Sequence, residues 1–256
     1  FVTDHEKIED CIDELVDYAE DSIPVLSETK ELLGVITAQD VVEAVDDEMG
    51  EDYAKLAGLT DEEDLRETTK ESMKKRLPWL IILLFLGMGV SSVVGAFEAV
   101  VAVLPIVMCF QSLILDMAGN VGTQSLAVTI RVLMDENLTG KQKLHLVWKE
   151  MKVGFVNGLL LGSLAFVFIG IYIACFKHNA WLHAFLISGC VGVSLMVAMV
   201  ISSLVGTLIP IFFHKIKIDP AVASGPLITT VNDLVAVVTY YGLAWLFLIQ
   251  IMQIVS

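Results

Sequence analysis

Charged residues are scarce in this chain. Of its 256 residues only 18% are Asp, Glu, Lys or Arg, whereas 55% are hydrophobic. A soluble domain usually has a charged fraction of about 25%. The composition therefore excludes a single soluble globular protein. It also excludes a nucleic-acid-binding protein as a class, because such a protein needs a basic surface.

Cysteine is rare as well, and the four cysteines are scattered, with no C-x-x-C pair and no histidine at metal-ligand spacing. This pattern excludes a disulfide framework and a zinc site. The sequence also lacks H-E-x-x-H, G-x-S-x-G and a Gly-rich Walker loop, so it does not indicate an enzyme. It begins FVTDHEKIED, with neither Met nor an apolar signal segment. We therefore expect it to start inside a longer protein.

The few charges are unevenly distributed. Residues 1–73 carry 24 Asp or Glu and 5 Lys or Arg, a net charge of −19, whereas residues 74–256 carry 7 and 11, a net charge of +4. The second part holds five apolar runs, each long enough for the about 20 residues that a bilayer requires. These runs are residues 77–97, 99–133, 153–176, 181–213 and 221–254. We predict an all-α polytopic membrane domain of five transmembrane helices over residues 77–256, in contact with membrane lipids.

Basic residues predict the orientation of this domain. Eleven lie before the first run, between the second and third, and between the fourth and fifth, whereas only Lys177 lies in the opposite loops. The positive-inside rule then places the N-terminal region in the cytoplasm and the C-terminus outside the membrane. Three runs, 99–133, 181–213 and 221–254, exceed the bilayer thickness, so they either protrude into the cytoplasm or break. Gly119-Asn120-Val121-Gly122 and Ser224-Gly225-Pro226 predict breaks in two of them, which would serve either helix structure or a pore.

Two carboxylates lie inside apolar runs, Asp116 and Asp233. Thr229 is four residues before Asp233 and shares its helix face, whereas Thr230 points elsewhere and can bond to the backbone one turn back. The Asp233 carboxylate, the Thr229 hydroxyl and the backbone carbonyls freed by the break are hard oxygen ligands, which suit Mg²⁺ or Ca²⁺. The alternative is a carboxylate satisfied by neighbouring helices. Asn120 joins Asp116 as a candidate ligand, although the small residues around it also suit close helix packing.

The N-terminal part reads as two short strands and a helix over residues 22–45, which resembles the second half of a CBS module. The segment Gly34-x-x-Thr37-x-x-Asp40 resembles the CBS segment that holds a nucleotide, which would place ATP at Thr37 and Asp40. Acidic clusters at 10–21 and 46–52 are either solvated surfaces or Mg²⁺ ligands. Residues 51–76 predict a connecting helix, with Thr60 and Asp61 as its caps.

Taken in this order, the partial CBS module, the connecting helix and the five spans resemble the MgtE family of magnesium channels and transporters. The resemblance covers essentially all 256 residues. The most specific segments are Arg76-Leu77-Pro78-Trp79-Leu80, Gly119–Ser125, and Asp219–Pro226 leading to Thr229-Thr230 and Asp233. Ala118 stands where many relatives carry glycine. The resemblance implies a homodimer with a pore on its two-fold axis, lined by the second and fifth spans, with Asp233 as the central pore carboxylate.

The resemblance also divides the chain into a partial cytoplasmic CBS module at 1–50, a connecting plug helix at 51–76 and a pore domain at 77–256. We therefore expect a Mg²⁺-selective channel or transporter in the plasma membrane that carries Mg²⁺ into the cytoplasm and closes when cytoplasmic Mg²⁺ is high. Two alternatives remain. One is a less selective transporter of Co²⁺, Mn²⁺ or Ni²⁺, and the other is a membrane-tethered CBS-type sensor of ions or nucleotides.

Overall fold

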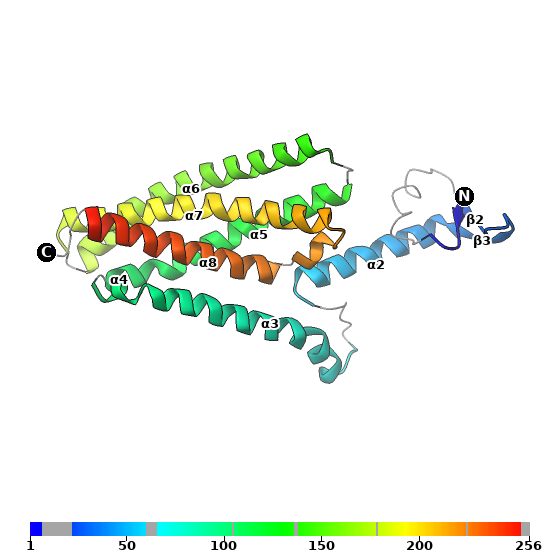
Figure 1. The fold of residues 1–256 in the computed structure, drawn as a ribbon, viewed down its shortest axis with the longest axis horizontal. Coiled ribbons are helices and arrows are strands. Elements are labelled where there is room, and N and C mark those ends of the chain that lie inside the picture. Colours follow the sequence, from blue (N-terminus) through cyan, green and yellow to red (C-terminus); the bar gives the residue numbers. More distant parts are fainter. Residues whose placement is uncertain are drawn as a thin grey trace. The chain divides into compact units, whose positions relative to one another are not determined.

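The structure is a computed structural model that describes residues 1–6, 22–59, 66–103, 105–135, 138–177, 179–223 and 225–251. The chain divides into two compact units. The first comprises residues 1–55 and 59–75, and the second comprises residues 56–58 and 76–256. Figure 1 labels most of the helices and strands of both units.

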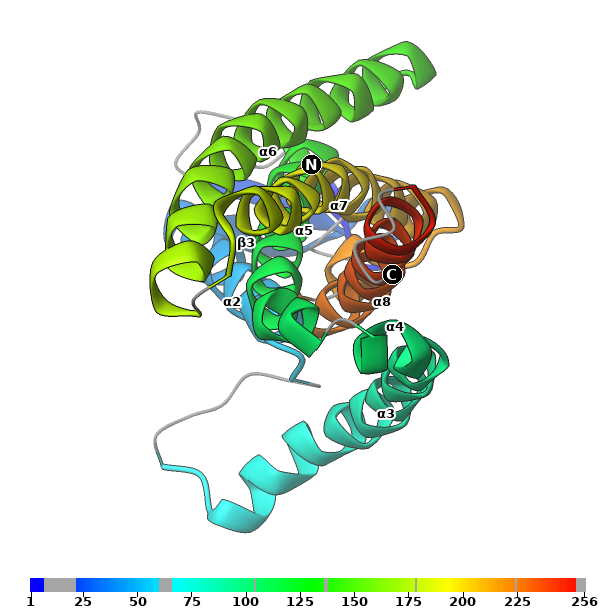
Figure 2. The ribbon, with the colours of Figure 1, turned by 90° about the vertical axis from the view of Figure 1, so that its left-hand side faces the viewer.

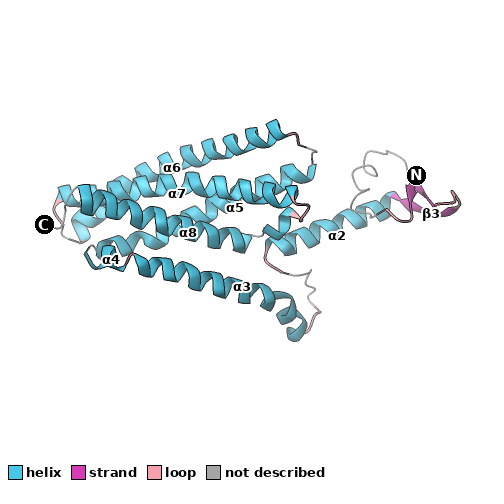
Figure 3. Cartoon of the chain, in the orientation of Figure 1, coloured by secondary structure: helices cyan, strands magenta, loops and turns pink. Residues whose placement is uncertain are grey.

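The first unit contains a small sheet in the order β1 (Val2–Thr3), β2 (Ser22–Leu26) and β3 (Leu32–Thr37). All described strands lie in this unit (Figure 3). β2 and β3 form an antiparallel hairpin, and β1 pairs with β2 in parallel. The helix α2 (Ala38–Leu56) follows directly. Val2 and Ile23 are buried, so the core is small, as a partial α/β module would have. The predicted order of two strands and a helix is confirmed.

The prediction of a single connecting helix over residues 51–76 is wrong, because parts of two helices lie in this range. α2 ends at Leu56, and Gly58 then adopts a φ of 81°, a left-handed conformation that favours glycine and ends a helix. The next helix, α3 (Thr69–Ala96), begins after Thr68. The backbone N–H and the hydroxyl of Thr68 both donate to the Glu71 carboxylate, which caps the new helix. The predicted caps Thr60 and Asp61 lie outside the described residues.

Five helical segments of the described chain are long and apolar enough to cross a membrane, which confirms the predicted number of spans. They are α3, residues Pro105–Leu133, α6 (Gly140–Phe176), α7 (Trp181–Lys215) and residues Gly225–Ile251. α6 starts well before the apolar run that predicted it, because the Thr139 hydroxyl and the Gln142 side chain form a capping box at its N-terminus.

The predicted break at Gly119–Gly122 is wrong, because α5 (Gln111–Asp135) continues through it as a regular helix. The irregular backbone of this span lies earlier, where α4 (Glu98–Val103) is followed by the 3₁₀ segment η1 (Pro105–Phe110). In the last span, the short η2 (Pro220–Ala223) precedes α8 (Gly225–Ala244), and the π-helical η3 (Trp245–Ile251) follows. Pro226 lies in the first turn of α8, where its missing N–H is tolerated. Ser224 is outside the described residues.

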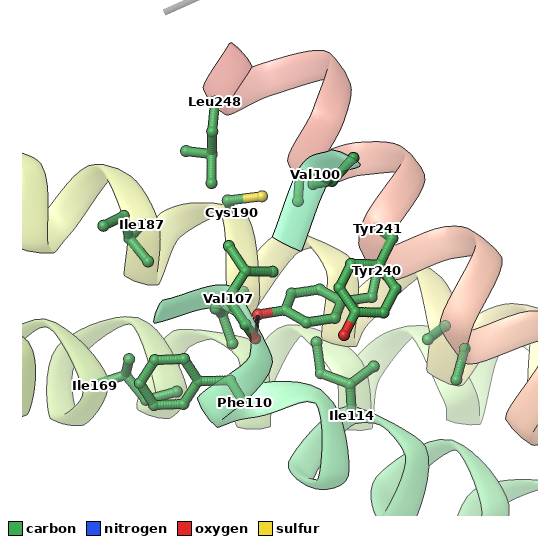
Figure 4. Packing of buried hydrophobic residues seen from close by; sticks show 14 of the residues in the cluster. Val100, Val107, Phe110, Ile114, Ile169, Ile187, Cys190, Tyr240, Tyr241 and Leu248 are labelled. Atoms are coloured by element: carbon green, nitrogen blue, oxygen red, sulfur yellow. Dashed lines mark hydrogen bonds between the residues drawn. The ribbon is translucent and has the colours of Figure 1, made fainter. Parts of the chain in front are cut away.

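The second unit packs around α7, which contacts α5, α6 and α8. Figure 2 shows α7 between α6 and α8. The α6–α7 contact is close because glycines meet there: a Cβ on either Gly162 or Gly192 would lie 2.6 Å from the other's carbonyl oxygen. The largest apolar cluster joins η1 and α5 to α7 and α8, with Tyr240 and Tyr241 fully buried at its centre (Figure 4).

Candidate functional site

The candidate site lies on α5 and α8, which run antiparallel. Near one end of the pair, the Tyr240 hydroxyl donates to the carbonyl oxygen of Val107 at 2.7 Å, and the Tyr241 hydroxyl donates to the side chain of Gln111 at 2.6 Å. Towards the other end, Ile228 is buried against Leu126. The C-terminal part of α8 therefore pairs with the start of α5, and the start of α8 with the second half of α5.

Asp233 is half-buried near the middle of α8. Within the described part of the chain, no hydrogen bond or ion pair engages its carboxylate. Thr229 lies one turn earlier and is also half-buried. A carboxylate without a basic partner inside an apolar span is costly unless something of positive charge reaches it. The structure therefore leaves the Asp233 carboxylate available for a cation.

The two threonines bond to their own helix. The Thr229 hydroxyl donates to the carbonyl oxygen of Gly225 at 2.7 Å, and the Thr230 hydroxyl donates to that of Pro226 at 2.9 Å. The second bond confirms the backbone pairing predicted for Thr230. The carbonyls of Gly225 and Pro226 are therefore not free, because both accept these hydroxyls in the first turn of a regular helix, whereas Ser224, where the break was predicted, lies outside the described residues. The Thr229 oxygen keeps its lone pairs and can still accept a hydrogen bond.

Asp116 and Asn120 lie one turn apart on an exposed face of α5. The Asn120 amide nitrogen donates to the Asp116 carbonyl oxygen at 2.9 Å and to its carboxylate at 3.1 Å. Further exposed polar residues continue the same face, and together they form what we call the polar stripe: Ser112, Asp116, Asn120, Thr123 and Gln124. Such a stripe is unfavourable against lipid, so in a membrane it must face water or another protein surface.

The four predicted ligands form two pairs, one on each helix. Asp116 and Asn120 contact each other on α5, and Thr229 shares its helix face with Asp233 on α8. Thr229 also approaches α5, since a Cβ on Gly119 would lie 3.4 Å from its methyl carbon. Among the described residues, no hydrogen bond joins the α5 pair to the α8 pair. The structure thus places all four on neighbouring helices without assembling them into one coordination shell.

Two buried polar groups were missed by the sequence reasoning. Asn232 is fully buried beside Asp233, and it contacts Gly122 of α5. Its signal was a second polar residue next to the recognised carboxylate. Glu150 of α6 is 5% exposed, and its carboxylate accepts a hydrogen bond from the Ser125 hydroxyl at 3.0 Å. Its position three residues before the predicted span made it look like a loop residue.

Thr37 and Asp40, proposed from the sequence for a nucleotide, form the N-terminal cap of α2. The backbone N–H and the hydroxyl of Thr37 each donate to the Asp40 carboxylate at 2.7 Å. These hydrogen bonds hold the pKa of Asp40 below its ordinary value of 3.8. Helix capping thus accounts for both residues, and their binding of ATP stays a prediction.

The structure describes only part of the acidic clusters that the sequence proposed as Mg²⁺ ligands. The cluster at 10–21 lies outside the described residues, and Asp46 and Asp47 of the second cluster are exposed on α2. Where the structure describes the chain, no three Asp, Glu, His or Cys side chains come together as a metal-binding group.

Comparison with known proteins yields two matching families. Residues 111–243, just over half of the chain, match the MgtE family, described as divalent cation transporters, and residues 1–47 match the CBS domain family. The first match contains α5 to α8, with all four candidate ligands, and the second contains the small sheet.

Three curated relatives are each named magnesium transporter MgtE. The chain is 37% identical to the Enterococcus faecalis protein over 240 residues, which is 94% of this chain and 51% of the relative. It is 38% identical to the Bacillus subtilis protein over 229 residues, or 89% and 48%. It is 32% identical to the Thermus thermophilus protein over 238 residues, or 91% and 50%. The chain therefore spans about half the length of these relatives.

Proposed function

The chain belongs to the MgtE family of divalent cation transporters, and from this premise we propose that it is a Mg²⁺-selective channel or transporter that carries Mg²⁺ across the plasma membrane into the cytoplasm. Proteins of this family are transporters and not enzymes, and five apolar helices make the chain a multi-pass membrane protein. The curated relatives carry magnesium transport in their names, which supports Mg²⁺ as the ion.

The observation that carries the proposal is the half-buried Asp233 on α8, whose carboxylate has no partner among the described residues. Mg²⁺ gives up its water reluctantly, and proteins usually hold it through one or two carboxylates while several waters stay bound. A lone carboxylate flanked by the Thr229 oxygen suits a hydrated ion better than a bare one. Asp116 and Asn120 would then contribute secondary oxygen contacts from α5.

The polar stripe of α5 supports a pore formed by two copies of the chain. A single subunit leaves the stripe exposed along a membrane-spanning helix, which lipid would not solvate. A homodimer with a two-fold axis along the stripe would cover it and enclose water. The same axis would bring two Asp233 carboxylates to one path, where their charge would attract a divalent cation.

Regulation is a further part of the proposal. The acidic N-terminal region, taken as cytoplasmic from the distribution of basic residues, would pack more tightly when Mg²⁺ neutralises its carboxylates. High cytoplasmic Mg²⁺ would in this way close the pore, because it binds the packed state better than the separated one. The CBS match supports a regulatory module and leaves ATP as a candidate ligand at Thr37 and Asp40.

Growth of a Mg²⁺-auxotrophic strain tests the function. The full-length protein should restore growth and Mg²⁺ uptake at low external Mg²⁺, and Asp233→Asn should abolish both while it still inserts into the membrane. Thr230→Val is the matched control on α8, because it removes a hydroxyl that bonds only to the helix backbone. Normal uptake by Asp233→Asn would refute the assignment of this carboxylate.

Two rivals give different results in the same cells. A less selective transporter would carry Co²⁺, Mn²⁺ or Ni²⁺ as fast as Mg²⁺. A membrane-tethered sensor would bind ions or nucleotides but would fail to restore growth at all. The unpaired Asp233 favours transport over the sensor, since an anchor needs no carboxylate within the membrane.

A further inference from the structure

The Asn232 side chain is fully buried, and neither its amide nitrogen nor its amide oxygen has a hydrogen-bond partner in the described chain. A buried amide without partners is unfavourable, and an apolar side chain of similar shape would avoid that penalty. The residue directly precedes Asp233, the carboxylate on which the proposed function depends. An unsatisfied polar group at this position therefore calls for a functional reason.

Asn232 lies against the backbone of α5 at Gly122. A Cβ on Gly122 would collide with the amide nitrogen and would lie 2.8 Å from the amide carbon of Asn232. On another side, the carbonyl oxygen of Gly122 leaves no room for a Cβ on Gly206 of α7. At Gly122, α5 therefore packs between α7 and the Asn232 amide of α8. The amide is excluded from water only while α5 and α8 stay in contact there.

The two ends of the α5–α8 contact differ in their packing and in their hydrogen bonds. At the end near the start of α5, two tyrosine hydroxyls bond across to Val107 and Gln111, and the largest apolar cluster surrounds them. Figure 4 shows Tyr240 and Tyr241 pointing towards the η1 and α5 ribbons. At Asn232 the contact consists of a glycine and an amide without a partner among the described residues, followed one turn further on by a smaller apolar cluster of Leu126, Ile130 and Ile228. Local opening occurs where packing and hydrogen bonds are weakest, which here is the Asn232 side.

We propose that the α5–α8 contact opens at Asn232 while its Tyr240 end stays closed, and that the Asn232 amide then joins the lining of the ion path beside Asp233. The inference rests on the proposed function. In the closed contact, the unpaired amide raises the free energy of the packed state. In the open contact, the amide is hydrated and bonds to the waters around the divalent cation, so Asn232 favours opening.

Thiol labelling tests the opening without reference to transport. Asn232→Cys and Ala236→Cys would each be made in full-length protein with all native cysteines replaced by serine. Ala236 is the matched control because it is fully buried on the same helix, one turn nearer to the tyrosine end. A water-soluble thiol reagent, applied in membranes without Mg²⁺, should label position 232 about tenfold faster than position 236, because thiolates react only where water reaches them. Equal rates, or no labelling at 232, would overturn the proposal.

A second experiment tests whether the amide assists transport. Asn232→Leu should raise the melting temperature by about 2–4 °C, because it removes the unpaired amide. It should also reduce Mg²⁺ flux into proteoliposomes about tenfold, since the closed contact is then favoured. Thr230→Val should leave the melting temperature and the Mg²⁺ flux unchanged. A fall in both quantities would mean that Asn232 serves packing alone, and unchanged flux would mean that the amide is not used. Either result rejects the proposal.

Two safeguards keep the results interpretable. If Asn232→Leu does not fold beside Gly122, the smaller Asn232→Val is expected to act in the same direction and is judged by the same outcomes. Wild type and Asp233→Ala in the same liposomes test the proposed function itself. Absence of wild-type flux would reject that function, and the labelling rates at positions 232 and 236 would then decide whether the contact opens.

Discussion

The Ser125 hydroxyl on α5 donates a hydrogen bond to the Glu150 carboxylate on α6, with 3.0 Å between the two oxygens. Both residues are buried, and this bond is one of few links between two helices that otherwise meet through α7. A buried carboxylate depends strongly on each hydrogen bond that it accepts. The hydrogen bond therefore ties the middle of α5 to α6, three residues from Gly122, which contacts Asn232.

Loss of this bond should destabilise the protein. Ser125→Ala leaves the Glu150 carboxylate buried without its donor, and we expect unfolding to become easier by about 1–3 kcal/mol. Thermal unfolding of the detergent-solubilised protein measures the effect. Ser112→Ala is the control, since that hydroxyl is exposed on the same helix. If both variants melted at the same temperature as wild type, the hydrogen bond would not contribute to stability.

The glycine contact between α5 and α7 should not tolerate a methyl group. A Cβ on Gly206 would collide with the Gly122 carbonyl oxygen, which belongs to a helix backbone and cannot easily shift. We expect Gly206→Ala to lower stability by about 1–3 kcal/mol. Gly189→Ala on the same helix should be nearly neutral, because its Cβ would lie 3.6 Å from the Phe166 ring, an ordinary contact. Equal melting temperatures for the two variants would contradict the close approach.

The hydroxyl of Tyr240 should contribute to stability at the closed end of the α5–α8 pair. Tyr240→Phe leaves the buried carbonyl of Val107 without this donor and should lower stability by about 1–2 kcal/mol. Tyr172→Phe is the matched control, since Tyr172 is 43% exposed. Melting curves of the two variants decide the matter, and a smaller loss for Tyr240→Phe than for Tyr172→Phe would show that the hydroxyl bond is not needed.

Asn120 should affect ion affinity more than maximal rate. If its amide oxygen contacts the hydrated ion, Asn120→Ala should raise the Mg²⁺ concentration for half-maximal uptake by about 2- to 12-fold, the loss expected for one hydrogen bond. Ala127→Ser, on the same exposed face of α5 but further along, should leave it unchanged. An unaltered concentration dependence for Asn120→Ala would remove this residue from the proposed ligands.

The cap of α2 should weaken in acid. The pKa of Asp40 is lowered in the folded protein by its hydrogen bonds from Thr37, so the ionised form stabilises the fold above the ordinary value of 3.8. That stabilisation is lost as the pH falls through the lower, folded-state pKa. Asp40→Asn should speed amide hydrogen exchange in the first turn of α2 at neutral pH. The difference from wild type should shrink in strong acid, and a difference that grew in acid would refute the cap.

The sequence predicted the elements whose signals are local. Asp233 stood out as a carboxylate in an apolar run, and the pairing of Thr230 with the backbone followed from spacing along one helix. The break at Gly119–Gly122 was misread because glycine signals both irregular backbone and close packing. Residues far away in sequence, Gly206 and Asn232, decide between them. Asn232 was missed for the same reason, since its burial depends on α5 and cannot be inferred from α8 alone.

The helix α3 has no buried residue anywhere along its length. Its exposed apolar side chains meet lipid or a second copy in a membrane, so hydropathy constrains them more than the shape of neighbours within their own subunit does. Exchanges among Leu, Ile, Val and Phe at Leu80, Leu84 or Phe85 should therefore be nearly silent. Comparable exchanges at buried positions of α7, such as Leu195, should lower stability, because neighbouring side chains surround them. Over evolutionary time, α3 is free to drift in sequence provided that its hydropathy stays high.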